Sequence, residues 1–280
     1  MIGVNAFEPT AFGFALVEAR SNARLSQLEL ALRAGTTQRH LSFLERGRSK
    51  PGSGLVIRLA ESIELPLRER NALLLSAGYA PVYPQTPISD PSLRPLYEAM
   101  RHILVAHDSF PALITDRIGT LLACNEALGV MIDGIAPELL VPPVNVRRLA
   151  LHPLGLAPRV INFAEWGRHV TEMIRHQIDR CPDDGEAALL SELDEYVGDG
   201  PAEPGSDYMG LAMPLHLKSS AGDLRLLTTV TSFSTAVDVT IAELRLEAFL
   251  PADAETATRL DSLRVKRRSN PPVALPGLVQ

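Results

Sequence analysis

The sequence has little of the chemistry that marks a secreted or membrane protein. Only two cysteines occur in 280 residues, Cys124 and Cys181, and they form no CxxC pair. Such scarcity is typical of a reducing compartment, where thiols pack rather than form disulfides. The longest apolar runs are shorter than the roughly 18 to 20 residues that span a bilayer, and the N-terminus lacks the cationic segment of a secretory signal. We therefore expect a cytoplasmic protein without membrane insertion.

Catalytic signatures are also missing from the sequence. It contains no GxSxG nucleophile elbow, no Walker-type phosphate loop and no GxGxxG turn. Neither cysteine has a histidine beside it. His169 and His176 are seven residues apart on one predicted helix, whereas helical metal sites more often use i and i+4 spacing. We expect neither an enzyme nor a metal site.

The composition is that of an ordinary globular chain with an uneven charge. Apolar residues make up 46% and charged residues 21% of it, and the length has room for roughly two domains. Residues 1–80 carry ten Lys and Arg against seven Asp and Glu, a net +3, so the total of -6 leaves -9 for the remainder. This asymmetry favours a polyanion as partner of the N-terminal segment alone.

Five short helical patterns fill residues 1–80. One opens with Ser26 and Glu29, an S-x-x-E capping box, and ends at Gly35. The next begins after Thr37 and ends at Gly47. Because only short turns separate the five patterns, we expect them to pack as one all-helical domain.

The remaining chain is predicted to hold a linker, a mixed domain and a tail. Residues 81–95 are rich in proline and read as a stiff linker. In residues 96–268, a hairpin pattern and the short helical pattern "EALGVMI" precede three helical patterns, three strand patterns and a last helix; the final strand is expected over residues 238–251. This order predicts an α+β domain with an antiparallel sheet flanked by helices. Residues 269–280 read as a disordered tail.

Within the helical domain, two helices joined by a short turn ending in glycine form a helix-turn-helix arrangement. In that arrangement the second helix enters the major groove of DNA. Gln38 and Arg39 occupy its first exposed positions, where they suit adenine and guanine. Ser42 and Phe43 follow one turn later, and Phe43 suits a thymine methyl group. The N-termini of both helices, at Gln27 and Gln38, offer N–H groups to phosphates.

The stretch "LSQLELALRAGTTQRHLSFLERGRSKP" resembles the Cro/repressor-type helix-turn-helix of the XRE family of bacterial transcriptional regulators. The resemblance implies base reading by Gln38, Arg39 and Phe43, and an ion pair between Arg20 and Glu45. The family also implies phosphate contacts by a set of mostly basic residues: Gln27, Thr37, Arg46, Arg48 and Lys50. A double-stranded operator with two half-sites would be bound by a homodimer.

Residues from about Leu96 to Leu263 are similar to the ligand-binding domain of MmyB-like regulators, and more generally to PAS-like sensors. The segments "NVRRLALHP" and "LTTVTSFSTAVDVTIAELRLEAFLPAD" carry this resemblance. It implies a buried pocket for a small amphipathic ligand, with a fatty acid as the class. The expected fold is therefore α + (α+β), a five-helix bundle followed by a PAS-like sheet domain.

An acyl-chain site needs an apolar tunnel with polar groups at one end. The tunnel candidates are apolar residues of the predicted strands and helices: Leu121, Met131, Trp166, Met173, Leu227, Val230 and Phe249. The polar candidates are side chains that suit a carboxylate headgroup: Asn125, Asn145, Arg148 and His152.

Two functions remain open at this point. The first is a sequence-specific DNA-binding transcriptional regulator whose DNA affinity is controlled by the ligand. The alternative is a DNA-anchored protein-interaction module whose C-terminal domain binds a protein partner and no small molecule. Co-purification of a lipid distinguishes the two, because only the first requires it.

Overall fold

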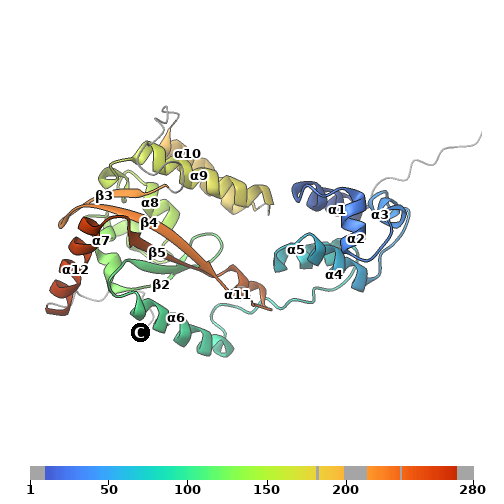
Figure 1. Cartoon of the computed structure of the whole chain (residues 1–280), viewed down its shortest axis with the longest axis horizontal. Coiled ribbons are helices and arrows are strands. Elements are labelled where there is room, and N and C mark those ends of the chain that lie inside the picture. The colour runs from blue at the N-terminus through green and yellow to red at the C-terminus, as the bar shows by residue number, and fades with distance from the viewer. Residues whose placement is uncertain (1–9, 181–182, 199–212, 234, 270–280) are drawn as a thin grey trace, which may run out of the picture. The chain divides into compact units, whose positions relative to one another are not determined.

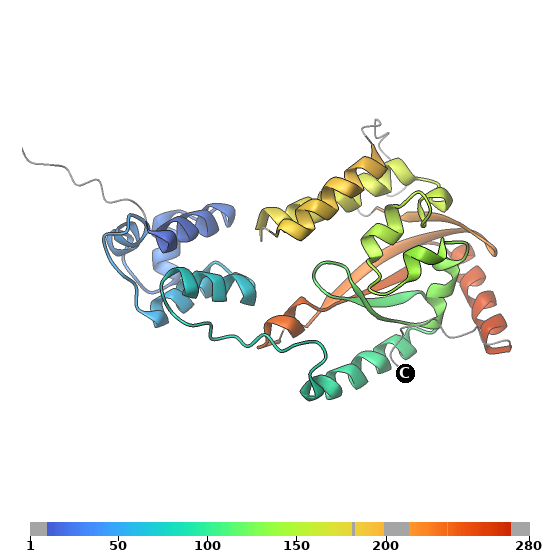
Figure 2. The same cartoon turned by 180° about the vertical axis from the view of Figure 1, so that it is seen from behind.

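The computed structural model describes residues 10–180, 183–198, 213–233 and 235–269 (Figure 1, and from behind in Figure 2). It divides into two compact units. The first, called the helical unit below, comprises Met1–Pro87 and Ser234–Ala242, and the second, called the sheet unit, comprises Ile88–Phe233 and Glu243–Gln280. The helical unit thus includes a short segment from far downstream in the chain.

The helical unit contains the five expected helices of the N-terminal bundle. The Ser26 hydroxyl accepts from the Glu29 N–H while the Glu29 carboxylate accepts from the Ser26 N–H, which completes the capping box of α2. Gly35 and Gly47 have positive φ angles of 64° and 68°, as glycines that end helices do. The helices are α1 (Ala11–Asn22), α2 (Gln27–Arg33), α3 (Gln38–Glu45), α4 (Ser53–Ser62) and α5 (Leu67–Ser76).

Leucines from four of these helices form the core of the helical unit. Leu16, Leu30, Leu44 and Leu59 have no exposed surface, and burial of each such side chain stabilises the fold by roughly 1.5 to 3 kcal/mol. Helices α1 and α3 approach closely at Gly13, where an added Cβ would lie 2.5 Å from the Glu45 carbonyl oxygen. The close approach fixes α3 against α1.

The segment after α5 is fastened to that helix. The Asn71 amide oxygen accepts from the N–H groups of Val82 and Tyr83, and its NH₂ group donates to the Tyr83 carbonyl at 2.7 Å. The Arg70 guanidinium lies 5.7 Å from the centre of the Tyr83 ring. The first part of the expected linker is therefore held in place rather than extended away from α5.

The downstream segment of the helical unit continues this attachment. Thr86 donates from its N–H and its hydroxyl to the Asp238 carboxylate, at 3.1 and 2.6 Å. The Val239 N–H donates to the Pro84 carbonyl at 2.8 Å. Asp238 is only 5% exposed, and it follows β4 in the chain. A connection between two strands of the sheet is thus bonded to residues 84–86.

The sheet unit is built around five strands in the order β2-β1-β5-β4-β3, each antiparallel to its neighbours. The predicted fold class, a helical bundle followed by a PAS-like antiparallel sheet domain with helices, is confirmed. The strands are β1 (Ala112–Thr115), β2 (Leu121–Cys124), β3 (Leu215–Ser219), β4 (Gly222–Ser232) and β5 (Arg245–Pro251).

Helices cover both faces of this sheet (Figures 1 and 2). Met100 and Leu104 of α6 pack on one face against Ile114, Leu246 and Ala248. The other face turns toward α8, α9 and the loops before them. The helices of the unit are α6 (Arg94–Ala106), α7 (Gly129–Ile132), α8 (Val146–Leu151), α9 (Phe163–Arg180), α10 (Asp184–Val197) and α12 (Ala254–Ser269), with short 3-10 helices η1 (Pro91–Leu93), η2 (Glu126–Leu128), η3 (Pro137–Leu140) and η4 (Ala157–Arg159).

One local prediction was wrong. The strand expected over residues 238–251 begins only at Arg245, because Val239–Glu243 forms a short helix, α11. Asp238 causes this, since its carboxylate accepts from the N–H groups of Thr240 and Ile241 and so starts a helical turn. The end of the expected linker is also helical, because α6 begins at Arg94.

The tail predicted over residues 269–280 lies, after Ser269, outside the described residues. In the described part of the chain, no helix is both long and apolar enough to cross a bilayer.

Candidate functional site

The outer side of α3 carries the four side chains that sequence reasoning assigned to base reading. Gln38 and Arg39 are exposed at the start of the helix, and Ser42 and Phe43 are half-buried one turn further on. The guanidinium carbon of Arg39 lies 5.5 Å from the centre of the Phe43 ring, a cation–π contact that orders both side chains. Thr37 caps the helix by accepting from the His40 N–H, so its hydroxyl already has a partner.

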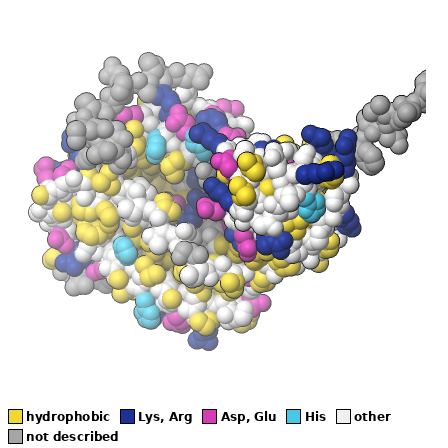
Figure 3. Space-filling view, turned by 45° about the vertical axis from the view of Figure 1, so that its right-hand side comes forward, with side chains coloured by type: hydrophobic (Ala, Val, Ile, Leu, Met, Phe, Trp, Pro, Cys, Tyr) yellow, Lys and Arg dark blue, Asp and Glu magenta, His cyan; other side chains and the backbone are white. Residues whose placement is uncertain are grey.

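Three exposed cations follow α3, namely Arg46, Arg48 and Lys50. The Lys50 ammonium lies 5.8 Å from the centre of the Tyr79 ring. Lys and Arg side chains are prominent on the surface of the helical unit in Figure 3, where they are dark blue. Arg46, Arg48 and Lys50 are the cations for which the sequence predicts phosphate contacts.

Glu45 ties the first three helices together. Its carboxylate accepts from Arg20 Nε at 2.6 Å and from Arg20 Nη2 at 3.3 Å, and the two side chains are only 15% and 5% exposed. It also accepts from Gln27 Nε2 at 2.6 Å. The expected pair of Arg20 and Glu45 therefore meets across the bundle. Because the Gln27 side chain is engaged there, its backbone N–H, at the first residue of α2, is the group left for a phosphate.

The sheet unit encloses a cavity of about 960 Å³ between the inner face of the sheet and α9. Among the described residues, 31 line the cavity, and only six of these carry polar side chains. One stripe of α9 faces the cavity, because its lining residues recur every three or four positions from Trp166 to Gln177. All seven apolar candidates from the sequence line it: Leu121, Met131, Trp166, Met173, Leu227, Val230 and Phe249.

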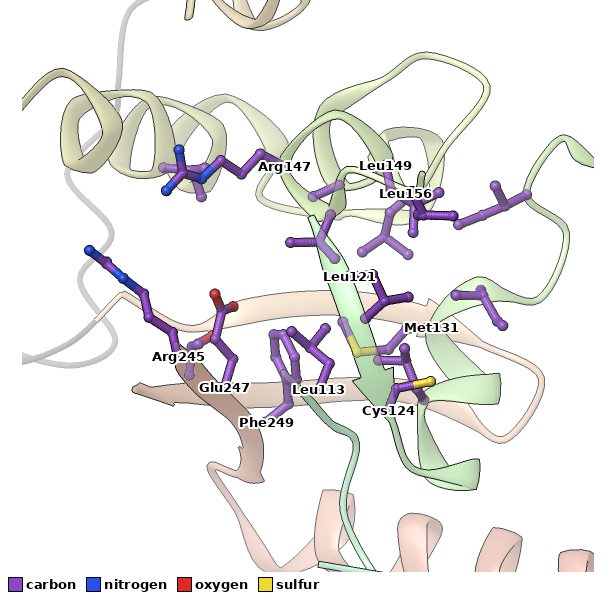
Figure 4. Close-up of a pocket in the computed structure, with 18 of the residues that line it drawn as sticks. Leu113, Leu121, Cys124, Met131, Arg147, Leu149, Leu156, Arg245, Glu247 and Phe249 are labelled. Atoms are coloured by element: carbon purple, nitrogen blue, oxygen red, sulfur yellow. The ribbon is translucent and has the colours of Figure 1, made fainter. Parts of the chain in front are cut away.

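Charged groups collect on one side of this cavity. Figure 4 shows Arg147, Arg245 and Glu247 there, while Met131 and Leu156 lie on the opposite side. Arg147 Nη2 donates to the Arg117 carbonyl at 2.9 Å and to the Gln177 amide oxygen at 3.1 Å. The cavity therefore has an apolar end and a charged end, as an amphipathic occupant requires.

Burial disfavours the charged forms of the ionisable side chains at that end. It raises the pKa of the Glu247 carboxyl, although Arg147 and Arg245 act in the opposite direction. Desolvation likewise lowers the pKa of Arg147, against the attraction of Glu186. The buried Glu186 carboxyl has a raised pKa for the same reason, opposed by Arg117 and Arg147. The charged end is thus incompletely compensated within the protein.

The four polar candidates from the sequence do not line the cavity, and that assignment is corrected. Asn125 instead supports the start of β1. Its amide oxygen accepts from the Ala112 N–H, and its NH₂ group donates to the carbonyls of His107 and Phe110 at 2.9 and 2.8 Å. Its hydrogen bonds are used within the fold.

The other three polar candidates are also engaged elsewhere. Arg148 forms a bidentate pair with Glu192 at 2.6 and 2.7 Å. Asn145 caps α8 by accepting from the N–H groups of Arg147 and Arg148. His152 accepts from the Leu154 N–H and packs edge-on against the Tyr196 ring.

Sequence reasoning missed Arg147, Arg245 and Glu247. The signal in β5 was the alternation of Arg245, Glu247 and Phe249, since residues two apart share one face of a sheet. Phe249 had been assigned to the tunnel, so its face also carried the two charged residues. For α8, residue type points to the neighbouring Arg148, and one residue of difference turns a side chain by about 100° around a helix.

In the described part of the chain, no group of three or more His, Cys, Asp or Glu residues is placed to hold a metal ion. His169 lines the cavity, whereas His176 is exposed on the outer side of α9.

Fold and cavity together define a protein that joins a helix-turn-helix head to a ligand-binding sheet domain. Residues 96–263, more than half of the chain, match the family model described as the MmyB-like transcription regulator ligand binding domain. Residues 16–70 match the model described as Helix-turn-helix. The chain belongs to the family of MmyB-like transcription regulators, which is a regulator family rather than an enzyme class.

A curated relative, "Uncharacterized HTH-type transcriptional regulator y4dL" of Sinorhizobium fredii (strain NBRC 101917 / NGR234), is 41% identical over 49 residues. The match covers 18% of this chain and 25% of the relative. A solved structure described as "Structure of an RNA-binding Light-Oxygen-Voltage Receptor" aligns at 12% identity with a TM-score of 0.25. That alignment covers 93% of this chain and 64% of the other, and at that score it does not bear on the fold.

Proposed function

We propose that this protein is a cytoplasmic, homodimeric and sequence-specific DNA-binding transcriptional regulator, and that a fatty acid or similar amphipathic ligand in the sheet unit controls its affinity for DNA. The observation that carries the proposal is the cavity, with an apolar interior of about 960 Å³ and a charged end. A protein-interaction domain without a ligand has no need of such a space, because interiors are otherwise close-packed.

The proposed DNA contacts are of two kinds, contacts to base edges and contacts to phosphates. Gln38, Arg39, Ser42 and Phe43 lie on the outer side of α3, where they meet base edges if the helix enters the major groove. The exposed cations after α3 and the N–H groups at the start of α2 and α3 are suited to phosphates. This division is typical of helix-turn-helix proteins.

The reading role is tested by comparing Arg39→Ala with Lys50→Ala. The first change should weaken binding to a selected operator by about 1 to 3 kcal/mol and relax the preference at one base pair. The second should weaken all duplexes alike and reduce the salt dependence of binding. The measurement is fluorescence anisotropy on operator and random duplexes over a range of salt concentrations. Equal effects of both changes on both duplexes would exclude the proposed reading face.

The ligand role is tested on the intact protein. Organic extraction followed by mass spectrometry should release an acyl compound in a fixed ratio to the protein. Removing and restoring that compound should change the affinity for operator DNA at fixed salt, since a ligand shifts DNA binding only by its differential affinity for two states. A protein that contains no lipid and is indifferent to added acyl chains would instead favour the protein-interaction alternative.

A further inference from the structure

The charged end of the cavity has hydrogen-bonding groups that no described residue uses. Arg147 Nη1 is buried and has no hydrogen-bond partner among the described residues; the nearest acidic atom among them, Glu186 Oε1, is 3.7 Å away. Buried donors without partners cost free energy, and proteins usually satisfy them. Arg147 also lines the cavity, so a rotation of its guanidinium would turn this unpaired donor toward an occupant.

Arg245 and Glu247 add a second donor and an acceptor to the same end. Both line the cavity from β5, and within the described residues neither side chain takes part in a hydrogen bond or an ion pair. The residues opposite Glu247 on the two neighbouring strands are the apolar Leu113 and Val230, whose side chains cannot hydrogen-bond to its carboxyl group. Its carboxyl group therefore faces the cavity, and neither oxygen is bonded to a described residue.

The arrangement selects for a particular kind of headgroup. The carboxylate of a simple fatty acid has only acceptors, so it satisfies the two arginines but has no hydrogen to donate to the Glu247 carboxylate. A carboxylate with a hydroxyl group next to it matches all three residues, because the hydroxyl donates to Glu247 while the carboxylate accepts from Arg147 and Arg245. An anionic head alone leaves the acceptor of Glu247 unmatched.

We propose that the ligand is a fatty acid hydroxylated close to its carboxylate, with Arg147 and Arg245 binding the carboxylate and Glu247 accepting from the hydroxyl group. The acyl chain then extends toward Met131 and Leu156 at the apolar end (Figure 4). This assignment rests on the proposed function and names the ligand class of the same cavity. Specificity arises because a site built to bind a hydroxyl group rejects analogues that lack it.

The test is calorimetric titration of the delipidated full chain with tetradecanoic acid and with the same acid hydroxylated at the first or the second carbon beyond the carboxyl group. At least one hydroxylated acid should bind about tenfold more tightly than the simple acid, since a hydrogen bond to a charged group contributes about that factor. In Glu247→Leu this preference should disappear while the simple acid still binds. In Glu172→Leu, which alters an exposed acid of α9, the preference should persist.

The outcomes separate the two proposals. If the simple acid binds as tightly as both hydroxylated acids, or if Glu247→Leu retains the preference, the headgroup assignment is wrong and the fatty-acid proposal survives. If none of the acids binds, both proposals fail together. Glu247→Gln guards against a folding defect in the leucine variant. It keeps an acceptor but loses the charge, so the preference should fall without vanishing, and an unchanged preference would also overturn the assignment.

Discussion

The thiol of Cys124 lines the apolar part of the cavity. Burial raises its pKa to about 11 from an ordinary value of 9.0, because the low-polarity surroundings disfavour the thiolate. The thiolate is the reactive form, so its fraction near neutral pH falls about a hundredfold with this shift. At the scale of one residue, the cavity therefore determines the chemistry of the side chain.

We predict slow alkylation of Cys124 that becomes slower still when the cavity is filled. In a Cys181→Ser background, iodoacetamide should modify the native protein at pH 8 about a hundredfold more slowly than the urea-unfolded chain. The rate should rise as the pH approaches 11, and tetradecanoic acid should lower it further. Mass spectrometry of the intact protein follows the reaction. Equal rates in the native and unfolded chains would show that the thiol is not held in an apolar environment.

Residue type alone was a poor guide to the polar end of the cavity. Asn125, Arg148 and His152 are the kinds of side chain that bind carboxylates, but each is used by a backbone or side-chain partner that lies far away in sequence. Those partners come from tertiary packing, which residue type does not reveal. The apolar candidates were placed better because strand and helix periodicity indicates which residues share a face.

At the scale of elements, α1, α2 and α3 are joined through one carboxylate. Glu45 binds Arg20 and Gln27 at a site that is 5% exposed. Removing one member of a buried pair leaves the other charge without compensation, at a cost of about 3 to 5 kcal/mol. The orientation of α3 against α1 and α2 thus depends on Glu45.

We predict that Glu45→Ala destabilises these helices by about 3 to 5 kcal/mol, whereas Glu18→Ala, at an exposed site of α1, changes stability by no more than about 0.5 kcal/mol. The double variant Arg20→Leu with Glu45→Leu should lose less than Glu45→Ala, since no charge is then stranded. Hydrogen exchange of the α1 to α3 amides in the full chain measures these differences. Unchanged protection in Glu45→Ala would remove the pair from the account of stability.

Element boundaries were predictable where a local signal determined them. The ends of α2 and α3 follow from Ser26, Thr37 and two glycines, each of which acts within three or four residues. The start of β5 was not predictable, because the alternation over residues 238–251 suits a strand throughout. Asp238 accepts from Thr86 as well as starting α11, and no pattern in the sequence links positions that are 152 residues apart.

At the scale of the whole molecule, the bonds between Thr86 and Asp238 suggest a route from cavity to head. Asp238 lies between β4 and β5, and both strands contribute residues to the cavity wall. Asp238 holds the linker at Thr86, and three residues earlier Tyr83 is bonded to Asn71 of α5. A change in the strands on ligand binding would therefore reach α5 through Asp238 and the short linker segment from Thr86 back to Tyr83.

We predict that Thr86→Val reduces the change in DNA affinity that the ligand causes. The affinity for the ligand without DNA, and the affinity for DNA without ligand, should each change by no more than about twofold. The variant removes the hydroxyl bond to Asp238 but leaves the cap of α11 intact. Asp253→Ala, which removes a comparable cap from α12, should leave the coupling unchanged. Operator titrations with and without the extracted acyl compound give the coupling for each protein. Full coupling in Thr86→Val would show that the signal takes another route.

The segment between β4 and β5 also affects how the protein can be divided. A cut anywhere in residues 81–95 separates the chain into two pieces. Ser234–Ala242 then stays with the C-terminal piece, although it belongs to the helical unit. If residues 1–87 were fused to the ligand-binding domain of another protein, they would lose the bonds that Asp238 and Val239 make to residues 84–86. A transfer that keeps these bonds would have to move Asp238 and Val239 together with residues 84–86.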